Sequence, residues 1–582
     1  MPAKKLILIA ILLIAALLRL WQIDTLPPGF HFDESFEGLE AWRILTDPTY
    51  RPIFLTGNFG VPPLNAYANA LTFGLFRLIG GEIGPMAMRI TAACFGIIGV
   101  LALYGLATEL RHLANQFKSI QLSPAFPIFA AATLAIMRWH IHFSRMGIEP
   151  IIVPLLWTAT FWLLLKGHRT NQWQPFIGCG ILLAACMYTY QAAWIIPLLT
   201  IPITLHLMFF HATSLRSSLS TIHYPLSTAL VAILLITPLC WFFWQNPDLL
   251  LLRPQQLNIV GATGSPADST LWGNLWATMK MFGPFGLPGD LDPRRNLPGA
   301  PAINIWLTIP FYLGLLITLW RFYQPAYAFI LWGLVGLLAP GIFSEYAPHF
   351  HRILGAAAPV ALFCGIGLDW IYQWSSKAKL SLRFIPLLIL ILAGTTSAHA
   401  YFIRWATQPA LYHAFDVGLW DVGSWIAKQP ADVPIYLTPR DANHATLAFA
   451  WQTRYPARPA PVTFDGRYIF PFNERINDDT EFYISLEQED FRTRLLLPEV
   501  FPDAEIVHEF LDTDGNIDAR VYARLPQTQA QRLPQVQWQA EIGDGIALLG
   551  YDVQPAQLQP SGILYLQLHW SVAEQPNQDW TV

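Results

Sequence analysis

The sequence predicts an all-α polytopic membrane domain, followed by an extracytoplasmic α/β region and the start of a β-rich domain. Of the 582 residues, 54% are hydrophobic and 13% are charged, whereas soluble globular chains carry roughly 25% charged residues. Apolar runs of membrane-spanning length recur through residues 1–400. Residues 401–582 instead hold 12 basic and 24 acidic side chains, against 23 and 15 in the rest of the chain. The two parts are therefore expected to do different work.

Eleven apolar segments are expected to be transmembrane helices. The first is interpreted as a retained span rather than a cleaved signal peptide, because it is long and no small-residue cleavage motif follows it. The segments are 5–22, 86–109, 124–140, 150–166, 174–189, 193–210, 224–243, 301–320, 323–340, 353–373 and 384–400.

The short connections between these segments predict the orientation. Those on one side are basic: "MPAKK", "RHLANQFK", "KGHRTNQW", "HATSLRSS", "RFYQ" and "SSKAKLSLR". By the positive-inside rule that side is cytoplasmic. A multi-pass protein of the plasma (inner) membrane is expected, with everything after residue 400 outside the cytoplasm. A twelfth span over 62–82 would invert the later loops, so this stretch is predicted to be a helix in the outer interface.

Two further regions follow the membrane domain. Residues 401–525 are predicted to form a soluble α/β region, with a helix in "DVGLWDVGSWIAKQ" and strands in "VPIYLTP", "EFYISL" and "DARVYARL". Residues 526–582 begin with a Pro/Gln-rich linker and continue with the alternation of β-strands, and the chain is expected to stop inside that domain.

Two kinds of site are not indicated. The five cysteines lie in apolar runs, so neither a disulfide framework nor a zinc framework is expected. No basic stripe suggests nucleic acid as a partner.

The first outer loop carries "HFDESFEGLEAW". Asp33 is placed to cap a helix over 34–46 that ends at "TDP", and Glu34 and the later glutamates suit its first turns. A capped, solvated interface helix is the structural alternative to a chemical role for Asp33 and Glu34.

The second outer loop, "RWHIHFSRMGIEP", concentrates ionisable residues. Such groups at membrane depth are costly and usually functional. Arg138 is expected to reach the interface from a span end. His142, Arg145 and Glu149 are candidate site residues.

Three later outer segments add aromatic and basic side chains. "YTYQAAW" holds Tyr190, for which an aromatic membrane belt is an equal alternative; "GDLDPRRNLPG" holds Arg294 and Arg295; "SEYAPHFHR" holds His351 and Arg352. The planar guanidinium fork suits phosphate, and a carboxylate suits deprotonation of a hydroxyl. The outer face is therefore predicted to act on a phosphate-bearing lipid.

The order of these motifs resembles the GT-C fold glycosyltransferases of family 39, which include protein O-mannosyltransferases and the aminoarabinose transferases that modify lipid A. The resemblance covers roughly 1–400 and rests on the Asp-Glu pair after the first span, the "PPL" helix and the "SR…E" loop. Asp33 matches the family's catalytic acid, and Glu34 is its usual neighbour. Glu149 stands where an acid follows a Ser-Arg pair, and "HFHR" resembles the segment proposed to hold donor phosphate.

This resemblance implies a polyprenyl-phosphate-linked sugar as donor and transfer to an acceptor hydroxyl on a protein, lipid or glycan at the outer face. Asp33 would act as the base, and the reaction would invert the anomeric carbon. No cofactor is certain. Some GT-C enzymes use a divalent metal, and because the sequence has no diagnostic metal-ligand spacing, a metal is left open.

Two other classes of function remain as alternatives. A secondary transporter would place its charges near mid-bilayer in broken helices and often shows inverted repeats, whereas here the charges gather in outer loops. A membrane-anchored binding or scaffold protein would not need the polar residues of 23–48 and 139–149.

Overall fold

The computed structural model describes most of the chain as two compact units. The first unit contains Met1–Lys428 with Asn443–Ala457, and the second contains Gln429–Ala442 with Arg458–Val582. The described residues are 2–116, 121–210, 223–250, 252, 270–283, 289–378, 380–472, 480–526, 533–543, 545–554 and 564–573.

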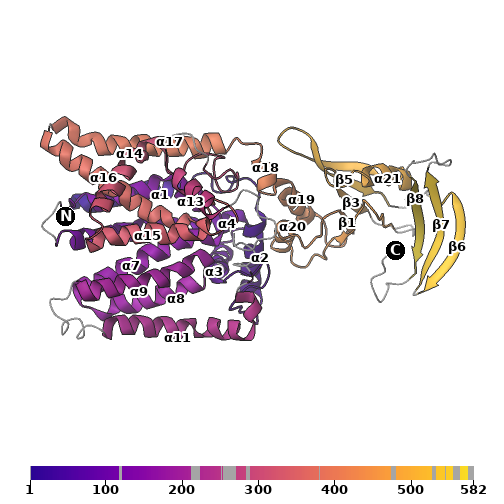
Figure 1. The fold of residues 1–582 in the computed structure, drawn as a ribbon. Coiled ribbons are helices and arrows are strands. Elements are labelled where there is room, and N and C mark those ends of the chain that lie inside the picture. The colour runs from indigo at the N-terminus through magenta and orange to yellow at the C-terminus, as the bar shows by residue number, and fades with distance from the viewer. Residues whose placement is uncertain are drawn as a thin grey trace. The chain divides into compact units, whose positions relative to one another are not determined.

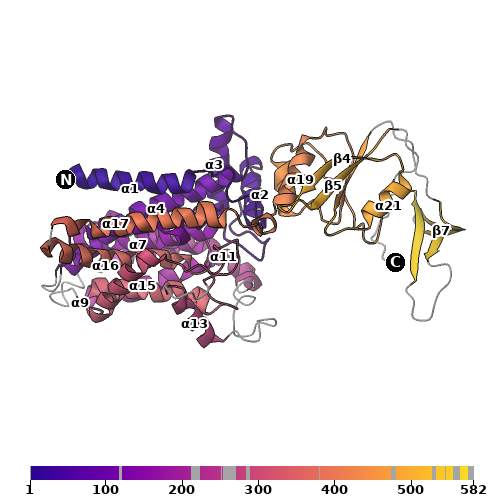
Figure 2. The same ribbon diagram turned by 90° about the horizontal axis from the view of Figure 1, so that it is seen from above.

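Long apolar helices that run side by side build most of the first unit (Figures 1 and 2). They are α1 (Pro2–Leu20), α4 (Pro85–Ala114), α5 (Phe126–Ile136), α7 (Ile152–Thr170), α8 (Trp173–Met187), α9 (Ile195–Phe210), α11 (His223–Gln245), α14 (Ile305–Trp320), α15 (Pro325–Ile342), α16 (Ala357–Ala378) and α17 (Ile385–His399). Among the described residues, six helices are long and apolar enough to cross a membrane. Each of the eleven predicted segments overlaps one of these bundle helices, and the exact number of spans stays a prediction.

Close packing between helices holds the bundle together. A Cβ on Gly314 of α14 would lie 1.8 Å from the Phe363 carbonyl oxygen of α16, and one on Gly367 would lie 2.0 Å from the Pro310 oxygen. Only glycine lets these two backbones approach so closely, as is common where helices pack in a membrane. These contacts join residues about fifty positions apart in the sequence.

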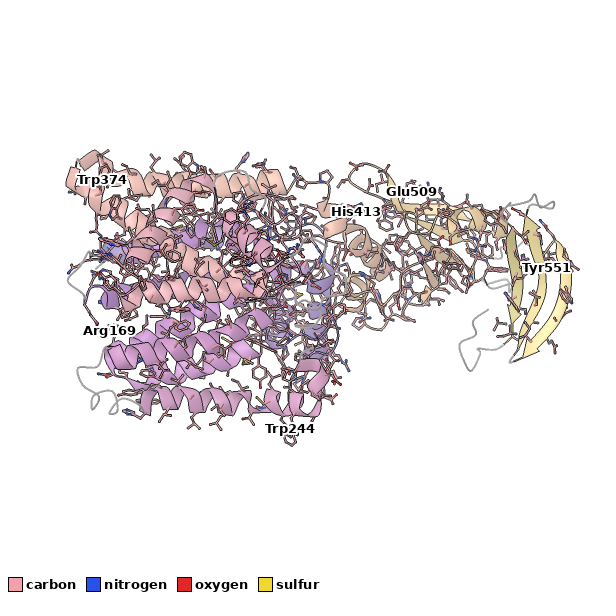
Figure 3. The ribbon with its side chains drawn as sticks, in the orientation of Figure 1. Arg169, Trp244, Trp374, His413, Glu509 and Tyr551 are labelled. Carbon is pink, nitrogen blue, oxygen red and sulfur yellow. The ribbon has the colours of Figure 1, made fainter. Side chains whose placement is uncertain are left out.

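The two ends of the bundle carry different connections. Arg169 and Trp374 are labelled at one end, where the N-terminus also lies, and Trp244 is labelled at the opposite end (Figures 1 and 3). The connection that contains Arg169 and the one that follows Trp374 are therefore at the same end as the N-terminus, which agrees with the predicted orientation.

Short helices cover the other end of the bundle. They are α2 (Phe32–Thr46), α3 (Leu64–Leu78), α6 (Arg138–Phe143), α13 (Leu271–Lys280), α18 (Leu411–Ala414), α19 (Val417–Lys428) and α20 (Ala445–Gln452). A short 3-10 turn, η1 (Glu149–Ile151), precedes α7. The ring of Phe30, just before α2, packs against Trp420 of α19 and Phe449 of α20 with centroids 5.5 and 4.9 Å apart. Residues after position 400 thus help to fix α2 in place.

The N-terminus of α2 corrects one expectation. His31, rather than Asp33, is the capping residue, because its Nδ1 accepts a hydrogen bond from the Asp33 N–H at 3.1 Å. Asp33 lies within the first turn of the helix, so its carboxylate is not used as a cap. The predicted helix over 62–82 is present as α3.

The second unit contains two small sheets. One has the strand order β2-β1-β3-β5-β4, in which β1 lies parallel to β2 and β3 while β5 lies antiparallel to β3 and β4. Helix α21 (Thr493–Val500) belongs to the same unit. The strands are β1 (Ile435–Thr438), β2 (Val462–Thr463), β3 (Glu481–Leu486), β4 (Glu505–Leu511) and β5 (Ile517–Arg524).

The other sheet is antiparallel, in the order β6-β7-β8. Its strands are β6 (Val536–Gly543), β7 (Ile546–Gln554) and β8 (Tyr565–Val572). The predicted fold class, a helical membrane domain followed by a region with strands, is confirmed. The boundaries proposed at 400 and 525 stay predictions.

Candidate active site

Asp33 offers a partly exposed carboxylate at the start of α2. Its side chain is 38% exposed, and Oδ1 accepts a hydrogen bond of 2.9 Å from the Asn58 amide. One oxygen is thereby fixed, while the carboxylate remains open to a substrate. His31 Nδ1 lies 3.8 Å from Oδ2.

Glu34, the neighbour of Asp33, points into the protein. It is fully buried and forms an ion pair of 3.4 Å with Arg89. The Gly147 N–H donates a hydrogen bond of 2.6 Å to its Oε1. Glu34 therefore joins α2 to α4 and to the loop before α7, and the structure does not bring it to the surface beside Asp33.

Glu37 and Glu149 form a buried carboxyl pair one helical turn beyond Asp33. Both side chains are almost completely buried, and the Asn65 amide donates to Glu37 Oε2 at 2.6 Å. Burial, together with the charge of Glu149 and the hydrogen bond to it, raises the pKa of Glu37 well above its usual range. Glu37 therefore keeps its proton to a higher pH than a free glutamate does, and the charge of Asp33 contributes to this shift.

Arg294 brings positive charge to the Asp33 side of the site. It binds Asp292 through its Nη2 at 2.6 Å, and its Nη1 lies 3.4 Å from His31 Nε2. The hydrogen bond to Asp292 raises the pKa of Arg294, and the charge of Asp33 adds to this effect. Asp33, His31 and Arg294 therefore form one electrostatic group assembled from α2 and the loop 289–300.

Arg295 and Arg352 extend this group on either side of Tyr346. Arg295 Nε donates to Asp290 at 2.8 Å, and its guanidinium also donates to the Tyr346 hydroxyl. Arg352 forms a bidentate ion pair with Glu345 at 2.7 and 2.8 Å. Its carbon Cζ lies 5.9 Å from the centre of the Tyr346 ring. We call the connected set Asp33, His31, Arg294, Asp292, Arg295, Tyr346, Arg352 and Glu345 the charged rim.

Two predicted residues lie directly behind Arg352. The Tyr190 and His351 rings stack with centroids 5.0 Å apart and planes at 14°. The charge of Arg352 interacts with Tyr190. The stacked rings of Tyr190 and His351 therefore lie beside Arg352, at the end of the charged rim.

His142 supports the opposite side of the rim. Its Nε2 lies 2.8 Å from the Arg294 carbonyl oxygen, and the side chain is buried. Burial lowers the pKa of His142 to about 3. The neutral imidazole therefore donates to this carbonyl and helps to position the backbone of Arg294.

Arg145, a predicted site residue, lies among backbone carbonyl groups at the end of α1. Its guanidinium is fully buried and donates to the carbonyl oxygens of Leu18, Arg19, Gln22 and Leu26, at 2.9 to 3.3 Å. Its Nε donates to the Tyr401 hydroxyl at 3.2 Å. All of these partners are protein groups, so the geometry favours a structural role at the end of α1.

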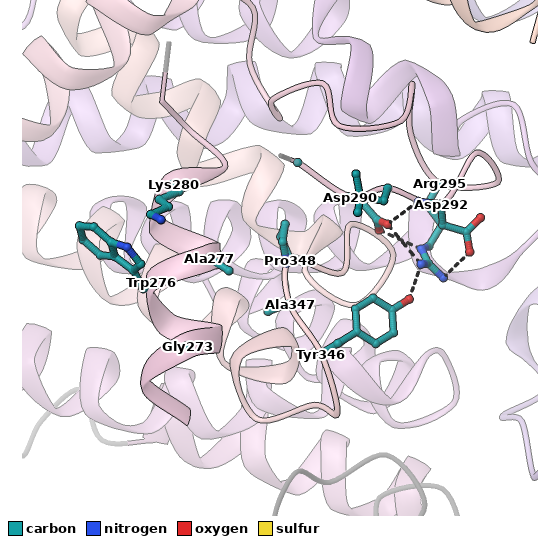
Figure 4. Close-up of a pocket in the computed structure, with 12 residues that line it drawn as sticks. Gly273, Trp276, Ala277, Lys280, Asp290, Asp292, Arg295, Tyr346, Ala347 and Pro348 are labelled. Atoms are coloured by element: carbon teal, nitrogen blue, oxygen red, sulfur yellow. Dashed lines mark hydrogen bonds and ion pairs between the residues drawn. The ribbon is translucent and has the colours of Figure 1, made fainter. Parts of the chain in front are cut away.

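A pocket of about 590 Å³ adjoins the charged rim (Figure 4). Asp290, Asp292, Arg295 and Tyr346 form one wall. The other lining residues are Gly273, Trp276, Ala277, Lys280, Gly289, Leu291, Ala347 and Pro348.

Sequence reasoning missed several residues of this site. His31 stands two positions before Asp33, and Asp290 and Asp292 lie in the same "GDLDPRRN" motif as the two arginines. Alternating acids and arginines in a loop are a usable signal for paired charges. Asn58 and Asn65 gave no such signal, because amides in loops and helix ends are common.

The sequence left undecided whether the site uses a divalent metal. Within the described ranges, no three or more His, Cys, Asp or Glu side chains are grouped to hold a metal ion.

Comparisons with known proteins identify the fold. No protein-family model and no curated protein sequence matches the chain. Among solved structures, apo ArnT from Cupriavidus metallidurans matches with a TM-score of 0.51 at 12% identity, covering 90% of this chain and 98% of ArnT. The apo oligosaccharyltransferase from Archaeoglobus fulgidus matches with a TM-score of 0.50 at 13% identity, covering 88% and 73% of the two chains.

Both proteins are glycosyltransferases of the GT-C type. At this identity the likeness concerns the fold, and it extends over nearly the whole chain. This chain is a multi-pass membrane protein with the GT-C fold.

Proposed function

We propose that the chain is a glycosyltransferase that moves a sugar from a polyprenyl-phosphate donor to an acceptor hydroxyl, with inversion and with Asp33 as the base. The observation that carries the proposal is the position of Asp33. Its carboxylate is open, is oriented by Asn58 and interacts through its charge with Arg294 of the charged rim. A base for the acceptor and cations for the leaving phosphate therefore adjoin each other.

The reaction follows from this arrangement in one displacement. Asp33 takes the proton of the acceptor hydroxyl while that oxygen attacks the anomeric carbon. The bond between the anomeric carbon and the phosphate oxygen breaks, and the lipid phosphate leaves with both bonding electrons. Attack opposite the leaving group inverts the anomeric carbon.

Arg294 is the proposed contact for the leaving phosphate. Its Nη1 faces His31 rather than a carboxylate, so it can add a phosphate oxygen without losing its bidentate pair with Asp292. Arg295 and Arg352 lie farther along the rim and would hold or orient the same group. The solved structure of Cupriavidus metallidurans ArnT bound to undecaprenyl phosphate, with a TM-score of 0.50 and 12% identity to this chain, supports the choice of donor class.

The extracytoplasmic face is part of the proposal. The basic connections at the other end of the bundle support it, because they would be cytoplasmic. A lipid-borne donor would then meet an acceptor that comes from outside the cytoplasm.

The test is to incubate the purified protein with a panel of polyprenyl-phosphate sugars and to measure which donor is converted to free polyprenyl phosphate. Sugar nucleotides serve as the comparison set. Consumption of a lipid-linked donor is expected. Consumption of sugar nucleotides alone, or of no donor with any acceptor class, would contradict the proposal.

A further inference from the structure

A short segment after the last bundle helix packs behind both sides of the candidate site. It begins with a π-helix, η5 (Ala400–Trp405), continues through α18 and ends at Phe415. We call residues 400–415 the connecting segment. The Trp405 and Phe415 rings are almost completely buried, and π-helical turns occur frequently at functional sites. The contacts of the segment lead in two directions, to the loop that carries Arg294 and to the residues before Asp33.

Two ring nitrogens hold the backbone beside the Arg294 side chain. Trp405 Nε1 donates a hydrogen bond of 2.8 Å to the Pro293 carbonyl oxygen. His142 Nε2 lies 2.8 Å from the carbonyl oxygen of the next residue, Arg294. The Trp405 ring packs against His142 and Tyr401, with centroids 4.7 Å away in both cases. Two consecutive carbonyl groups are thus fixed from outside the loop, and the direction of the Arg294 side chain depends on both.

The far end of the connecting segment fixes the residues that lead into α2. The Phe30 N–H donates a hydrogen bond of 2.9 Å to the Phe415 carbonyl oxygen. The Phe415 ring lies 6.2 Å from the ring of His31, which caps α2. A Cβ on Gly29 would lie 2.4 Å from the same Phe415 oxygen, so this close approach requires glycine. The start of α2, and with it Asp33, is therefore held by Phe415.

The two ends of the connecting segment also contact each other. The Trp405 and Phe415 rings meet edge to face, with centroids 5.8 Å apart and planes at 83°. Buried aromatic pairs of this kind are closely packed and have a preferred geometry. The hydrogen bond to the Arg294 loop and the one to Phe30 are therefore linked through a single pair of rings.

Direct contact across the site is weak by comparison. Because His31 Nδ1 accepts a hydrogen bond from the Asp33 N–H, the ring carries its proton on Nε2. His31 Nε2 faces Arg294 Nη1, which is also a donor, at 3.4 Å. Two donors do not form a hydrogen bond with each other, so this contact does not hold the two sides together.

We propose that Trp405 and Phe415 are positioning residues that set the spacing between Asp33 and the Arg294 side chain. Each acts through the backbone of another residue, so neither needs to touch a substrate. The positioning itself rests on the contacts above, whereas its effect on sugar transfer rests on the proposed function.

The first test is the rate of transfer from a lipid-linked sugar by Trp405→Phe. This variant loses the indole N–H and keeps a buried aromatic ring, and its kcat/KM for the donor should fall about fivefold or more, as for loss of one buried hydrogen bond. Trp306→Phe is the matched control, because Trp306 Nε1 donates at 3.1 Å to Thr396 Oγ1, between α14 and α17. Its kcat/KM should stay at the wild-type value. A wild-type kcat/KM for Trp405→Phe would overturn the inference.

A double-mutant cycle separates positioning from a general packing defect. If Trp405 acts through Arg294, Trp405→Phe should lower kcat/KM little further in a chain that already carries Arg294→Met. A purely structural defect would lower kcat/KM by the same factor with and without Arg294, and that result would overturn the inference.

Hydrogen exchange without substrate tests the same contacts independently of the function. Trp405→Phe should speed amide exchange in residues 289–300, and Phe415→Leu, which removes the ring contacts, should speed it in residues 30–35. Trp306→Phe should change neither segment. Wild-type exchange in both segments of both variants would overturn the inference. Faster exchange in a protein that consumes no lipid-linked sugar would reject the proposed function and leave the positioning contacts standing.

Discussion

At the scale of single residues, the environment of Asp33 separates a chemical role from a structural one. His31 caps α2, and the Asp33 side chain accepts a hydrogen bond from the Asn58 amide. Asparagine at this position would keep the size of the side chain and would leave the cap intact. A defect in Asp33→Asn would therefore report on proton transfer rather than on the helix.

We expect Asp33→Asn to reduce sugar transfer by ~10²–10⁴-fold, because an amide cannot accept the acceptor proton. The measurement is the initial rate of polyprenyl phosphate release under saturating donor. Glu40→Gln is the matched control, because Glu40 lies on the same helix and accepts a hydrogen bond of 2.5 Å from the Tyr50 hydroxyl. Transfer near the wild-type rate by Asp33→Asn, in protein that binds donor normally, would remove Asp33 as the base.

The raised pKa of Glu37 makes the stability of the folded chain depend on pH. Because burial and Glu149 raise its pKa, the folded chain keeps a proton that the unfolded chain releases above the usual glutamate pKa of ~4.3. The free energy of unfolding should therefore fall as pH rises from that value toward the raised pKa. Glu37→Gln removes this titration and should flatten the curve.

Melting temperatures of wild type, Glu37→Gln and Glu40→Gln between mildly acidic and alkaline pH check this expectation. Glu37→Gln should gain stability relative to wild type as pH rises, while Glu40→Gln should run parallel to wild type. A wild-type curve that Glu37→Gln merely shifts by a constant amount would show that Glu37 is already ionised in the folded chain.

The sequence predicted which side chains belong to the candidate site only in part. Asp33 was found because it follows a span and opens a helix, both of which are local patterns. Glu34 looked equivalent in sequence, yet it turns inward to Arg89, and only the packing of α2 on α4 decides this. The partners of the arginines likewise depend on which loops meet, although Asp290 and Asp292 stand beside them in the chain.

At the scale of elements, Arg145 fixes the end of the first helix. The carbonyl groups at a helix C-terminus lack partners within the helix. Arg145 donates to several of them around the end of α1 and to Leu26 beyond it. This places the segment that leads to α2, and hence Asp33, relative to the loop before α7.

Arg145→Met is expected to destabilise the protein by at least ~3 kcal/mol, because several buried carbonyl groups lose a charged donor at ~1–3 kcal/mol each. Arg294→Met, at a partly exposed ion pair, should cost only ~0–1 kcal/mol but should weaken donor binding. Melting temperature and donor Kd, measured on both variants, separate the two roles. A stable Arg145→Met protein with a raised donor Kd would instead restore Arg145 to the phosphate site.

At the scale of the whole molecule, the orientation in the membrane remains to be tested. Arg169 and Trp374, which lie in or next to two basic connections, are at the same end of the bundle (Figure 3). By the positive-inside rule, this predicts that the opposite end and the second unit lie outside the cytoplasm. In a variant without its native cysteines, Asp514→Cys should react with a membrane-impermeant maleimide in intact cells. Gln172→Cys, in the connection after α7, should react only after the membrane is permeabilised. The reverse pattern would invert the topology.

The helices and strands could be predicted from the sequence better than the packing contacts between segments that are distant in the chain. Apolar length and loop charge predicted each helix of the bundle, and alternation predicted β1, β3 and β5. Sequence reasoning assigned α19 to a separate soluble region, whereas its Trp420 packs against Phe30 beside α2. Such contacts depend on shape across more than 380 positions of the chain, for which local periodicity carries no information.

The paired arginines of the charged rim have a consequence for turnover. Each guanidinium that would bind a phosphate already has an internal counter-ion: Asp292, Asp290 or Glu345. A phosphate would then meet cations that are already partly neutralised, so its net affinity would be lower than the full attraction of a bare cation. A spent carrier lipid differs from its loaded form chiefly by the missing sugar, so a rim of unpaired cations would retain it. Under the proposed function, carboxylates that stay paired with their arginines would lower the affinity for the released carrier lipid, which would limit product inhibition.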